Sequence, residues 1–139
     1  MLKKILFLGL ILAVIGGFIG YKMYHKPHAD MGSANPDLTM DAAELYNAYT
    51  ANEEEANQKY LGKIIQISGT ISSIMKDDNT VKGVGLETGD MLTGLNCMLD
   101  VVDTNHRQDF RKGSSVTFNC KCNGKLMDIE LNRCVEVNK

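Results

Sequence analysis

The chain begins with a run of uncharged, mostly apolar residues that covers positions 5–21 and has lysines on both sides. These 17 residues correspond to about 25 Å of α-helix, close to the shortest helix that spans a lipid bilayer. Tyr21 and Tyr24 are suited to the membrane interface, where aromatic side chains gather. The pattern therefore predicts a single-pass membrane anchor over residues 1–26, which contacts the membrane through residues 5–24.

A cleaved signal peptide is the alternative interpretation, because it also has a positively charged start and an apolar segment. Cleavage normally follows small residues just beyond the apolar stretch. Here residues 21–25 are bulky, and the nearest patterns of small residues end further on, at Ala29 and Ala34. We therefore expect an uncleaved signal-anchor helix in the cell membrane. Secretion after cleavage stays open as the alternative.

The next segment, residues 27–38, is polar, holds both prolines of the chain and shows no periodicity, which indicates a linker. His25 and His28 lie near its start. Two histidines without a third ligand are more typical of solvated side chains than of a metal site. We expect the domain proper to occupy residues 39–139.

Two signals for the start of a helix follow the linker. Asp41 with Glu44, and Asn52 with Glu55, both have the spacing of a capping box. Gly62 is typical of the residue just beyond a helix end. The sequence therefore predicts two short helices, or one helix kinked between the two boxes.

After the helices, hydrophobic residues recur at every second position, which predicts β-strands. Gly69 lies inside the first of these runs and indicates a sharp bend. Polar turns at residues 76–79 and 88–90 separate the next runs, and Asn123-Gly124 is a strong signal for a two-residue hairpin. Five short strands with such turns suit a small barrel or sandwich.

Charge divides the chain into two parts. The formal charge of the whole is -2, but the first 26 residues contain four lysines and no acidic residue. The remainder has 11 basic and 17 acidic residues, a formal charge of -6. Domains that bind single-stranded nucleic acid combine a basic face with aromatic stacking platforms. The aromatic residues beyond the anchor fall mostly on the predicted helices or in the predicted core: Tyr46, Tyr49, Tyr60, Phe110 and Phe118. Charge and aromatic placement therefore disfavour nucleic acid as a ligand.

Candidate catalytic residues are few. His106 is the only histidine beyond the linker, and no nucleophile or orienting partner is evident for it. Asp128 and Glu130 alternate along one predicted strand, which is typical of a solvated strand face. The cysteines lack the paired CxxC spacing of zinc sites. We therefore expect no enzyme activity, no catalytic residue, no metal site and no cofactor.

Four cysteines in a small domain suit an oxidising compartment, which favours an extracytoplasmic, for example periplasmic, domain. Four cysteines allow three pairings if two bonds form. Cys120 and Cys122 lie on one predicted strand and cannot easily bond to each other. With a two-residue hairpin at Asn123-Gly124, Cys134 lies opposite residue 113, roughly 25–30 Å from Cys122. This register argues against a Cys122–Cys134 bond.

Three stretches resemble the tRNA_anti-like family of bacterial OB-fold domains: YNAYTANEEEANQKYLGKIIQISGTISSI, GLNCML and FNCKCNGKLMDIELNRCVEV. The resemblance covers residues 39–138. Its most specific part is the C-terminal piece, where a cysteine and a glycine two positions on precede an MDIEL-like strand and Cys134. Cys120 departs from the family pattern, which has glycine at that position. Members of this family are secreted, lipid-anchored or membrane-anchored, and the family has no assigned activity.

The resemblance implies a mainly β fold, with a five-stranded OB-fold barrel after one or two short helices and an N-terminal transmembrane helix. In such a barrel the third and fifth strands are neighbours, which implies a disulfide between Cys97 and Cys134 and leaves Cys120 and Cys122 as further cysteines. The expected function is a membrane-tethered binding or adaptor module that recognises another envelope protein, a peptide or a saccharide. A single-stranded nucleic-acid-binding OB-fold protein is the alternative. No residue of the ligand site is identified at this stage.

Overall fold

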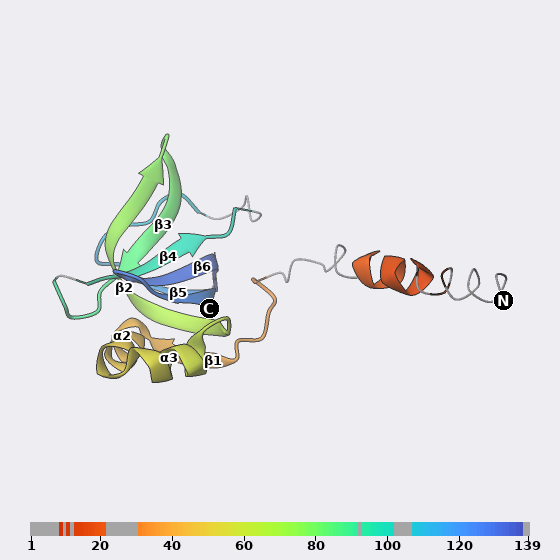
Figure 1. Cartoon of the computed structure of the whole chain (residues 1–139). Coiled ribbons are helices and arrows are strands. Elements are labelled where there is room, and N and C mark those ends of the chain that lie inside the picture. Colours follow the sequence, from red (N-terminus) through yellow and green to blue (C-terminus); the bar gives the residue numbers. More distant parts are fainter. Residues whose placement is uncertain are drawn as a thin grey trace.

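The computed structural model describes residues 9, 11, 13–21, 31–91, 93–101 and 107–137 of the chain (Figure 1). Six strands and two helices are assigned in residues 31–137. In chain order they are β1 (Leu38–Asp41), α2 (Ala42–Ala51), α3 (Glu53–Tyr60), β2 (Ile64–Asp77), β3 (Thr80–Leu86), β4 (Leu95–Leu99), β5 (Ser115–Lys125) and β6 (Ile129–Glu136).

Five of the strands form a closed barrel. Their order is β2-β3-β4-β6-β5, and β5 pairs again with β2 to close the ring. β4 and β6 run parallel, whereas the other barrel pairs are antiparallel. β1 lies outside the ring and pairs in parallel with the first part of β2. This five-stranded arrangement is an OB-fold barrel, so the predicted mainly β fold is confirmed.

The predicted bend at Gly69 is confirmed by the pairing of β2. Residues 64–70 of this strand pair with β5, and residues 71–77 pair with β3. A Cβ atom on Gly69 would lie 3.2 Å from the Cβ of Ala42 and 3.3 Å from the Cδ1 of Leu86. Glycine therefore lets helix α2 and strand β3 approach the bend closely, where the strand changes partner.

The two helices start where the sequence predicts. Asp41 caps α2, since its Oδ1 accepts a hydrogen bond of 2.7 Å from the backbone N–H of Glu44, and Asn52 caps α3 through a bond of 3.2 Å from the N–H of Glu55. Both helices pack on one end of the barrel, as Figure 1 shows. They contribute buried side chains to the core, among them Tyr49.

The predicted hairpin at Asn123-Gly124 is wrong. β5 continues through both residues, and the chain turns at residues 126–128 before β6 begins. Gly124 has a φ of +92°, and a Cβ there would lie 3.2 Å from the Cδ1 of Leu61. The register slips by one residue between Cys122 and Gly124, so this glycine belongs to a β-bulge rather than to the turn.

A second bulge lies in β6 at Arg133, which has a φ of +55°. β6 advances three residues there, from Asn132 to Val135, while β5 advances two, from Lys121 to Asn119. β4 meets the same extra residue, because Cys97 pairs with Leu131 but Leu99 pairs with Cys134. The bulges, together with the later turn, replace the register expected from a simple hairpin.

Part of the predicted linker packs on the barrel. The Nδ2 of Asn119 donates hydrogen bonds to the carbonyl oxygens of Met31 (3.3 Å) and Ala34 (3.2 Å). The Met31 side chain is 2% exposed. Asp37 and Ile64 exchange two hydrogen bonds just before β1 begins. The chain is therefore fastened to β5 before it reaches the first strand.

The N-terminal helical residues, 13–21, are exposed. Among the described residues, no helix combines the length and the apolar composition that crossing a membrane requires. The rest of the predicted anchor, and the predicted cleavage region up to Ala29, lie outside the described residues. So do His25, His28 and His106.

Candidate functional site

A polar groove lies on the outer face of the barrel. Its volume is about 470 Å³, and it is bordered by β2, β3, β4 and the loop between β3 and β4. The turn between β5 and β6 contributes Asp128. Cavities of a few hundred Å³ are the usual size of ligand sites in proteins.

The floor of the groove is made of backbone, because β3 carries glycine at two successive outward positions. Gly83 pairs with Met98, and Gly85 pairs with Asn96, whereas Val84 between them faces the core. A Cβ atom on Gly85 would lie 2.3 Å from the Oγ of Ser73. Glycine at this position therefore leaves room for the Ser73 side chain, which also lines the groove.

The wall formed by Asp128 is held by two hydrogen bonds. Its Oδ1 accepts a bond of 2.9 Å from the backbone N–H of Gly94, and its Oδ2 accepts a bond of 3.1 Å from the Nδ2 of Asn96. Asn96 points outward from β4 because its neighbours in that strand, Leu95 and Cys97, face the core. These contacts fix the carboxylate relative to the floor.

The opposite wall is the loop of residues 87–91. Thr88 is 7% exposed; its Oγ1 donates to the carbonyl oxygen of Thr93 (3.0 Å) and accepts from the backbone N–H of Asp90 (3.4 Å). The hydroxyl of Tyr46, on helix α2, donates to the Oδ2 of Asp90. The loop is thereby tied both to itself and to a helix.

The groove is acidic. Glu87, Asp90 and Asp128 line it, and the described lining residues include no lysine and no arginine. Serine, threonine and asparagine side chains supply the remaining polar groups. A ligand with negative charge would meet repulsion here, whereas a positively charged or a neutral ligand would not.

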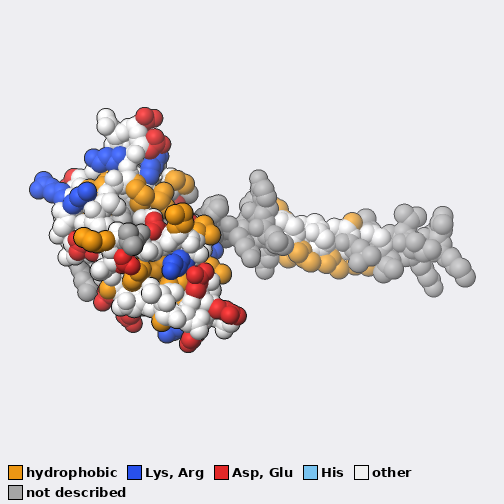
Figure 2. Space-filling model, turned by 60° about the vertical axis from the view of Figure 1, so that its left-hand side comes forward, with side chains coloured by type: hydrophobic (Ala, Val, Ile, Leu, Met, Phe, Trp, Pro, Cys, Tyr) orange, Lys and Arg blue, Asp and Glu red, His pale blue; other side chains and the backbone are white. Residues whose placement is uncertain are grey.

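Apolar side chains lie on the strands and turns that border the groove, and we call Met75, Met91, Met98, Leu126 and Met127 the methionine rim. Met91 lines the groove itself, and Met75 is half-buried. Met91 is fully exposed, Met127 is 88% exposed and Leu126 is 81% exposed. Met75 and Met98 lie over Gly83, with atoms 3.1 and 3.0 Å from the position of its missing Cβ. In Figure 2, hydrophobic and acidic side chains lie next to each other on the surface of the barrel.

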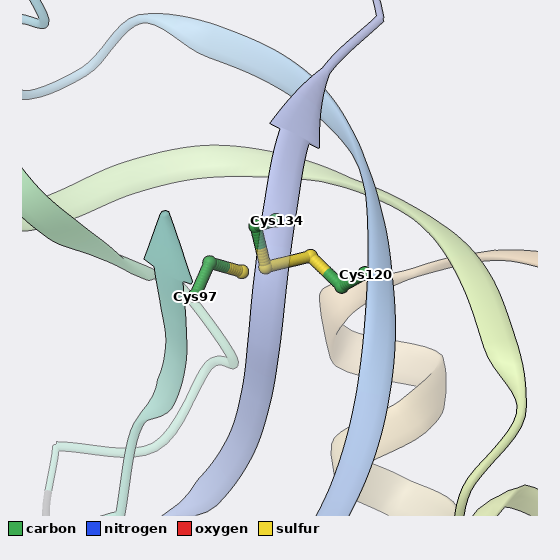
Figure 3. Close-up of side chains that lie close together, drawn as sticks. All are labelled: Cys97, Cys120 and Cys134. Atoms are coloured by element: carbon green, nitrogen blue, oxygen red, sulfur yellow. A yellow bond between two sulfur atoms is a disulfide. The ribbon is translucent and has the colours of Figure 1, made fainter. Parts of the chain in front are cut away.

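Three buried cysteines meet in the core behind the groove. Cys120 and Cys134 form a disulfide with a Cα–Cα distance of 4.2 Å. Cys97 is a free thiol, and its sulfur lies within 4.8 Å of the other two sulfurs. Figure 3 shows the Cys97 side chain pointing from β4 toward the disulfide that joins β5 and β6.

The expected Cys97–Cys134 disulfide is therefore wrong, although the expected neighbourhood of β4 and β6 is correct. The bulge at Arg133 places Leu99, not Cys97, beside Cys134 in the β4–β6 ladder. The same bulge brings Cys134 opposite Cys120 in the β5–β6 hairpin. Cys120, which the expected pairing leaves unbonded, is thus the partner of Cys134.

Burial governs the chemistry of the Cys97 thiol. Burial raises the pKa of Cys97 above its ordinary value, because the thiolate would be desolvated. The Cys122 sulfur lies 3.4 Å from the hydroxyl of Tyr49. Burial first, and this contact with Cys122 second, also raise the pKa of Tyr49. Because burial keeps the Cys97 thiol protonated, this thiol is a poor nucleophile and a poor metal ligand, which indicates a packing role.

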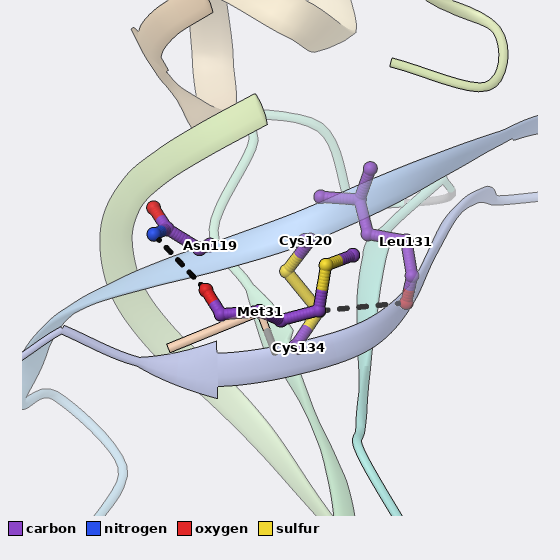
Figure 4. The surroundings of a disulfide bond; sticks show 5 residues. All are labelled: Met31, Asn119, Cys120, Leu131 and Cys134. Atoms are coloured by element: carbon purple, nitrogen blue, oxygen red, sulfur yellow. Dashed lines mark hydrogen bonds between the residues drawn. A yellow bond between two sulfur atoms is a disulfide. The ribbon is translucent and has the colours of Figure 1, made fainter. Parts of the chain in front are cut away.

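The disulfide is covered by the chain segment that precedes β1. Figure 4 shows Met31 beside Cys120 and Cys134, with its carbonyl oxygen bonded to Asn119. The Cys134 sulfur lies 3.6 Å from the carbonyl oxygen of Leu131. Cys120 and Cys134 are both buried, and Met31, which lies beside them, comes from outside the two strands. The segment around Met31 therefore covers the disulfide on this side.

Two aromatic residues considered from the sequence, and a nearby arginine, have structural partners. Phe118 is fully buried and Phe110 nearly so, and their rings lie 6.0 Å apart. Arg107 forms a salt bridge of 2.9 Å with Glu136 and lies over the ring of Phe110. The groove itself was missed, although alternating glycines in TVKGVGL and the later Asp128 were visible in the sequence.

Comparison with known proteins agrees with the fold. The sequence profile of the tRNA_anti-like family matches residues 1–135, which is nearly the whole chain. The chain belongs to the tRNA_anti-like family. The match to this family includes the N-terminal segment that precedes the barrel. No curated protein matches the chain.

Two solved structures resemble this member of the tRNA_anti-like family. One is a proposed nucleic acid-binding lipoprotein from Klebsiella pneumoniae, which is 16% identical, with a TM-score of 0.56 over 72% of this chain and 92% of that chain. The other is a proposed aspartyl-tRNA synthetase from Leishmania major, which is 12% identical, with a TM-score of 0.45 over 88% of this chain and 26% of that chain. At such identities the Klebsiella structure supports the fold alone.

Proposed function

We propose that this protein is a membrane-tethered, extracytoplasmic OB-fold module that binds a partner or ligand in the acidic groove and catalyses no reaction. The observation that carries the proposal is the place of the groove. OB-fold domains bind oligonucleotides and oligosaccharides on the face of their second and third strands, flanked by the loops after strands one and four. Here those strands are β3 and β4, and the second of those loops supplies Asp128.

The charge of the groove favours a ligand other than nucleic acid. Proteins that bind single strands need cations for the phosphates and aromatic rings for the bases. The described lining residues offer three carboxylates and no aromatic ring, and Tyr46 lines only the adjoining hollow. The description of the Klebsiella protein favours the alternative, a single-stranded nucleic-acid-binding protein.

The lining residues also support a binding role over a catalytic one. Among the described residues of the groove, no histidine, cysteine or lysine stands beside the serine and threonine hydroxyls. Such a group is the usual activator of a hydroxyl nucleophile. Both oxygens of Asp128 accept hydrogen bonds from neighbouring groups, which suits a fixed wall.

Three observations support tethering outside the cytoplasm. The apolar run at residues 5–21 has the composition of a membrane anchor. The Cys120–Cys134 disulfide suits an oxidising compartment. The Klebsiella neighbour is described as a lipoprotein. Alkaline phosphatase and a fluorescent protein, each fused after the last residue, report opposite sides of the membrane, and phosphatase activity alone is the expected result.

The ligand class is tested with the full chain in a neutral detergent and with fluorescein-labelled single-stranded DNA and RNA. We expect no change in fluorescence anisotropy at micromolar protein and low salt. Micromolar binding that weakens as salt is added would overturn the proposal in favour of nucleic acid, because such salt dependence is the signature of phosphate contacts.

A further inference from the structure

We propose that the acidic groove and the methionine rim together dock a segment of a partner protein that carries both basic and apolar side chains. This inference rests on the proposed function and names the class of its ligand. The inference combines two features of this surface, a concentration of carboxylates and a border of exposed methionines. An OB fold can form without either of them.

The negative charges of the groove favour a positively charged group in its ligand. Glu87, Asp90 and Asp128 approach the same cavity from two different loops, and no cation lies among its described lining residues. Complementary potentials guide partners to such sites and fix their register. A lysine or arginine side chain would be attracted to these carboxylates, whereas a neutral saccharide would gain no such attraction.

The fixed groups of the groove are largely hydrogen-bond acceptors. The carboxylate of Asp128 already uses the donors of Gly94 and Asn96, and Asp90 accepts from Tyr46. The donors nearest to these carboxylates are thereby engaged, while carboxylate oxygens have room for further bonds. An ammonium or guanidinium group brings only donors, so it matches this arrangement.

The rim supplies the apolar half of the surface. Met91, Leu126 and Met127 expose most of their area to solvent on two loops at the border of the groove. Methionine is flexible and polarizable, adapts its shape to different partners and is enriched at protein interfaces. Exposed side chains of this kind lose unfavourable contact with water when apolar residues of a partner cover them.

The occupant would be held by its side chains rather than by strand addition. β3 is paired on both edges, with β2 and β4, and β4 is paired with β3 and β6. Beside the groove, residues 83–86 of β3 are therefore paired on both edges within the described residues, which leaves no open edge there for another strand. A cavity of about 470 Å³ holds one or two long side chains, so a short segment presented by a larger protein fits it.

The test uses the full chain in neutral-lipid nanodiscs, with empty nanodiscs as the blank. The probe is a fluorescein-labelled ten-residue peptide of alternating lysine and leucine. Two comparison peptides replace all lysines by glutamate, or all leucines by serine. We expect binding of the lysine–leucine peptide, at least tenfold weaker binding of the lysine–serine peptide, and no binding of the glutamate–leucine peptide.

Substitutions in the groove and the rim then locate the binding site. Glu87→Gln and Met91→Ser should each weaken binding about fivefold or more, the size expected for a contact at an interface. Glu54→Gln, on helix α3, and Val101→Ser, an exposed apolar residue away from the groove, are the matched controls and should change binding less than twofold. Equal binding to all four variants would overturn the inference, because the peptide would then bind elsewhere.

A second ligand set separates this inference from the proposed function. Chitin and glucan oligosaccharides are added to the same nanodiscs. If an oligosaccharide binds and Gly85→Val abolishes that binding while the lysine–leucine peptide fails to bind, the groove is a ligand site but the basic partner segment is wrong. If neither binds and labelled single-stranded RNA does, both the inference and the proposed function are wrong.

Discussion

The two faces of strand β4 differ sharply although they share five residues. Toward the core, Leu95, Cys97 and Leu99 are buried among apolar side chains. Toward solvent, Asn96 supports Asp128, and Met98 covers Gly83. Burial explains the inner face, whereas the outer side chains are held mainly by contacts with one another. The comparison teaches that the outer residues are where function is to be sought.

The largest expected effect is on the inner face. Leu95→Ala should lower the free energy of unfolding by about 2–5 kcal/mol, because it leaves a cavity in a closed core. Asn96→Ala, one residue away on the outer face, should cost about 1 kcal/mol for its lost hydrogen bond. Urea unfolding of the detergent-solubilised chain, followed by circular dichroism, measures both. An equal loss of unfolding free energy in Leu95→Ala and Asn96→Ala would show that the two faces contribute equally to stability.

The cysteine cluster provides the next test of the inner face. Cys120→Ala removes a disulfide that closes a loop between residues 14 positions apart, which should cost about 3 kcal/mol. Because the sulfur of Cys97 lies within 4.8 Å of that of Cys134, we expect oxidised glutathione to form a Cys97–Cys134 bond in this variant. Peptide mapping by mass spectrometry under non-reducing conditions detects it.

Cys122→Ala is the control for that experiment, since Cys122 lies outside the cluster and should leave the Cys120–Cys134 bond intact. If Cys97, Cys122 and Cys134 are all still free thiols in the Cys120→Ala protein after oxidation, the sulfurs of Cys97 and Cys134 are not within reach of each other in solution.

Gly83 lies on the outer face of the barrel, where a side chain would press on the backbone of β4. Its Cβ would lie 2.8 Å from the carbonyl oxygen of Cys97, a backbone atom of the neighbouring strand. We expect Gly83→Ala to cost about 2 kcal/mol, within the range of overpacked sites. Lys82→Ala, at the exposed position before it, should change stability by less than about 0.5 kcal/mol. Urea unfolding measures the free energy of unfolding of both variants. An unchanged value for Gly83→Ala would show that β3 and β4 can move apart at little cost.

The smallest effect is a dependence on alkaline pH that comes from the inner face alone. Burial raises the pKa of Cys97 in the folded protein, so the unfolded chain loses this proton first as pH rises. Stability is therefore fully present below the ordinary thiol pKa, about 8.5, and falls above it by up to about 1.4 kcal/mol per pH unit. Cys97→Ala should flatten the stability profile between pH 8.5 and 10. An unchanged slope would assign the loss to other groups.

The sequence predicts those parts of the fold that depend on neighbouring residues. The caps at Asp41 and Asn52 and the bend at Gly69 each need only a few positions, and all three are present. The β5–β6 hairpin depends instead on two bulges and a later turn. One of the bulges lies at Arg133, a residue type that seldom adopts a positive φ, so no local signal marks it. The disulfide pairing depends on that bulge, so the sequence does not predict the pairing either.

The groove shows a different limit. Its acidic residues look like ordinary solvated positions in the sequence, because Glu87 and Asp90 lie in a turn and Asp128 lies beside a hairpin. Only the closed barrel brings these two loops to one cavity. The glycines of β3 are the local sign that side chains of the neighbouring strands lie close above this strand.

The attachment of residues 31–34 to Asn119 has a mechanical consequence. Figure 1 shows this segment and the loop of residues 87–91 on opposite sides of the barrel. A tether that pulls at one side and a partner that pulls at the other would load the strands between them. The Cys120–Cys134 bond links β5 to β6 covalently at the residue next to Asn119. Such a bond would keep these two strands from separating under tension.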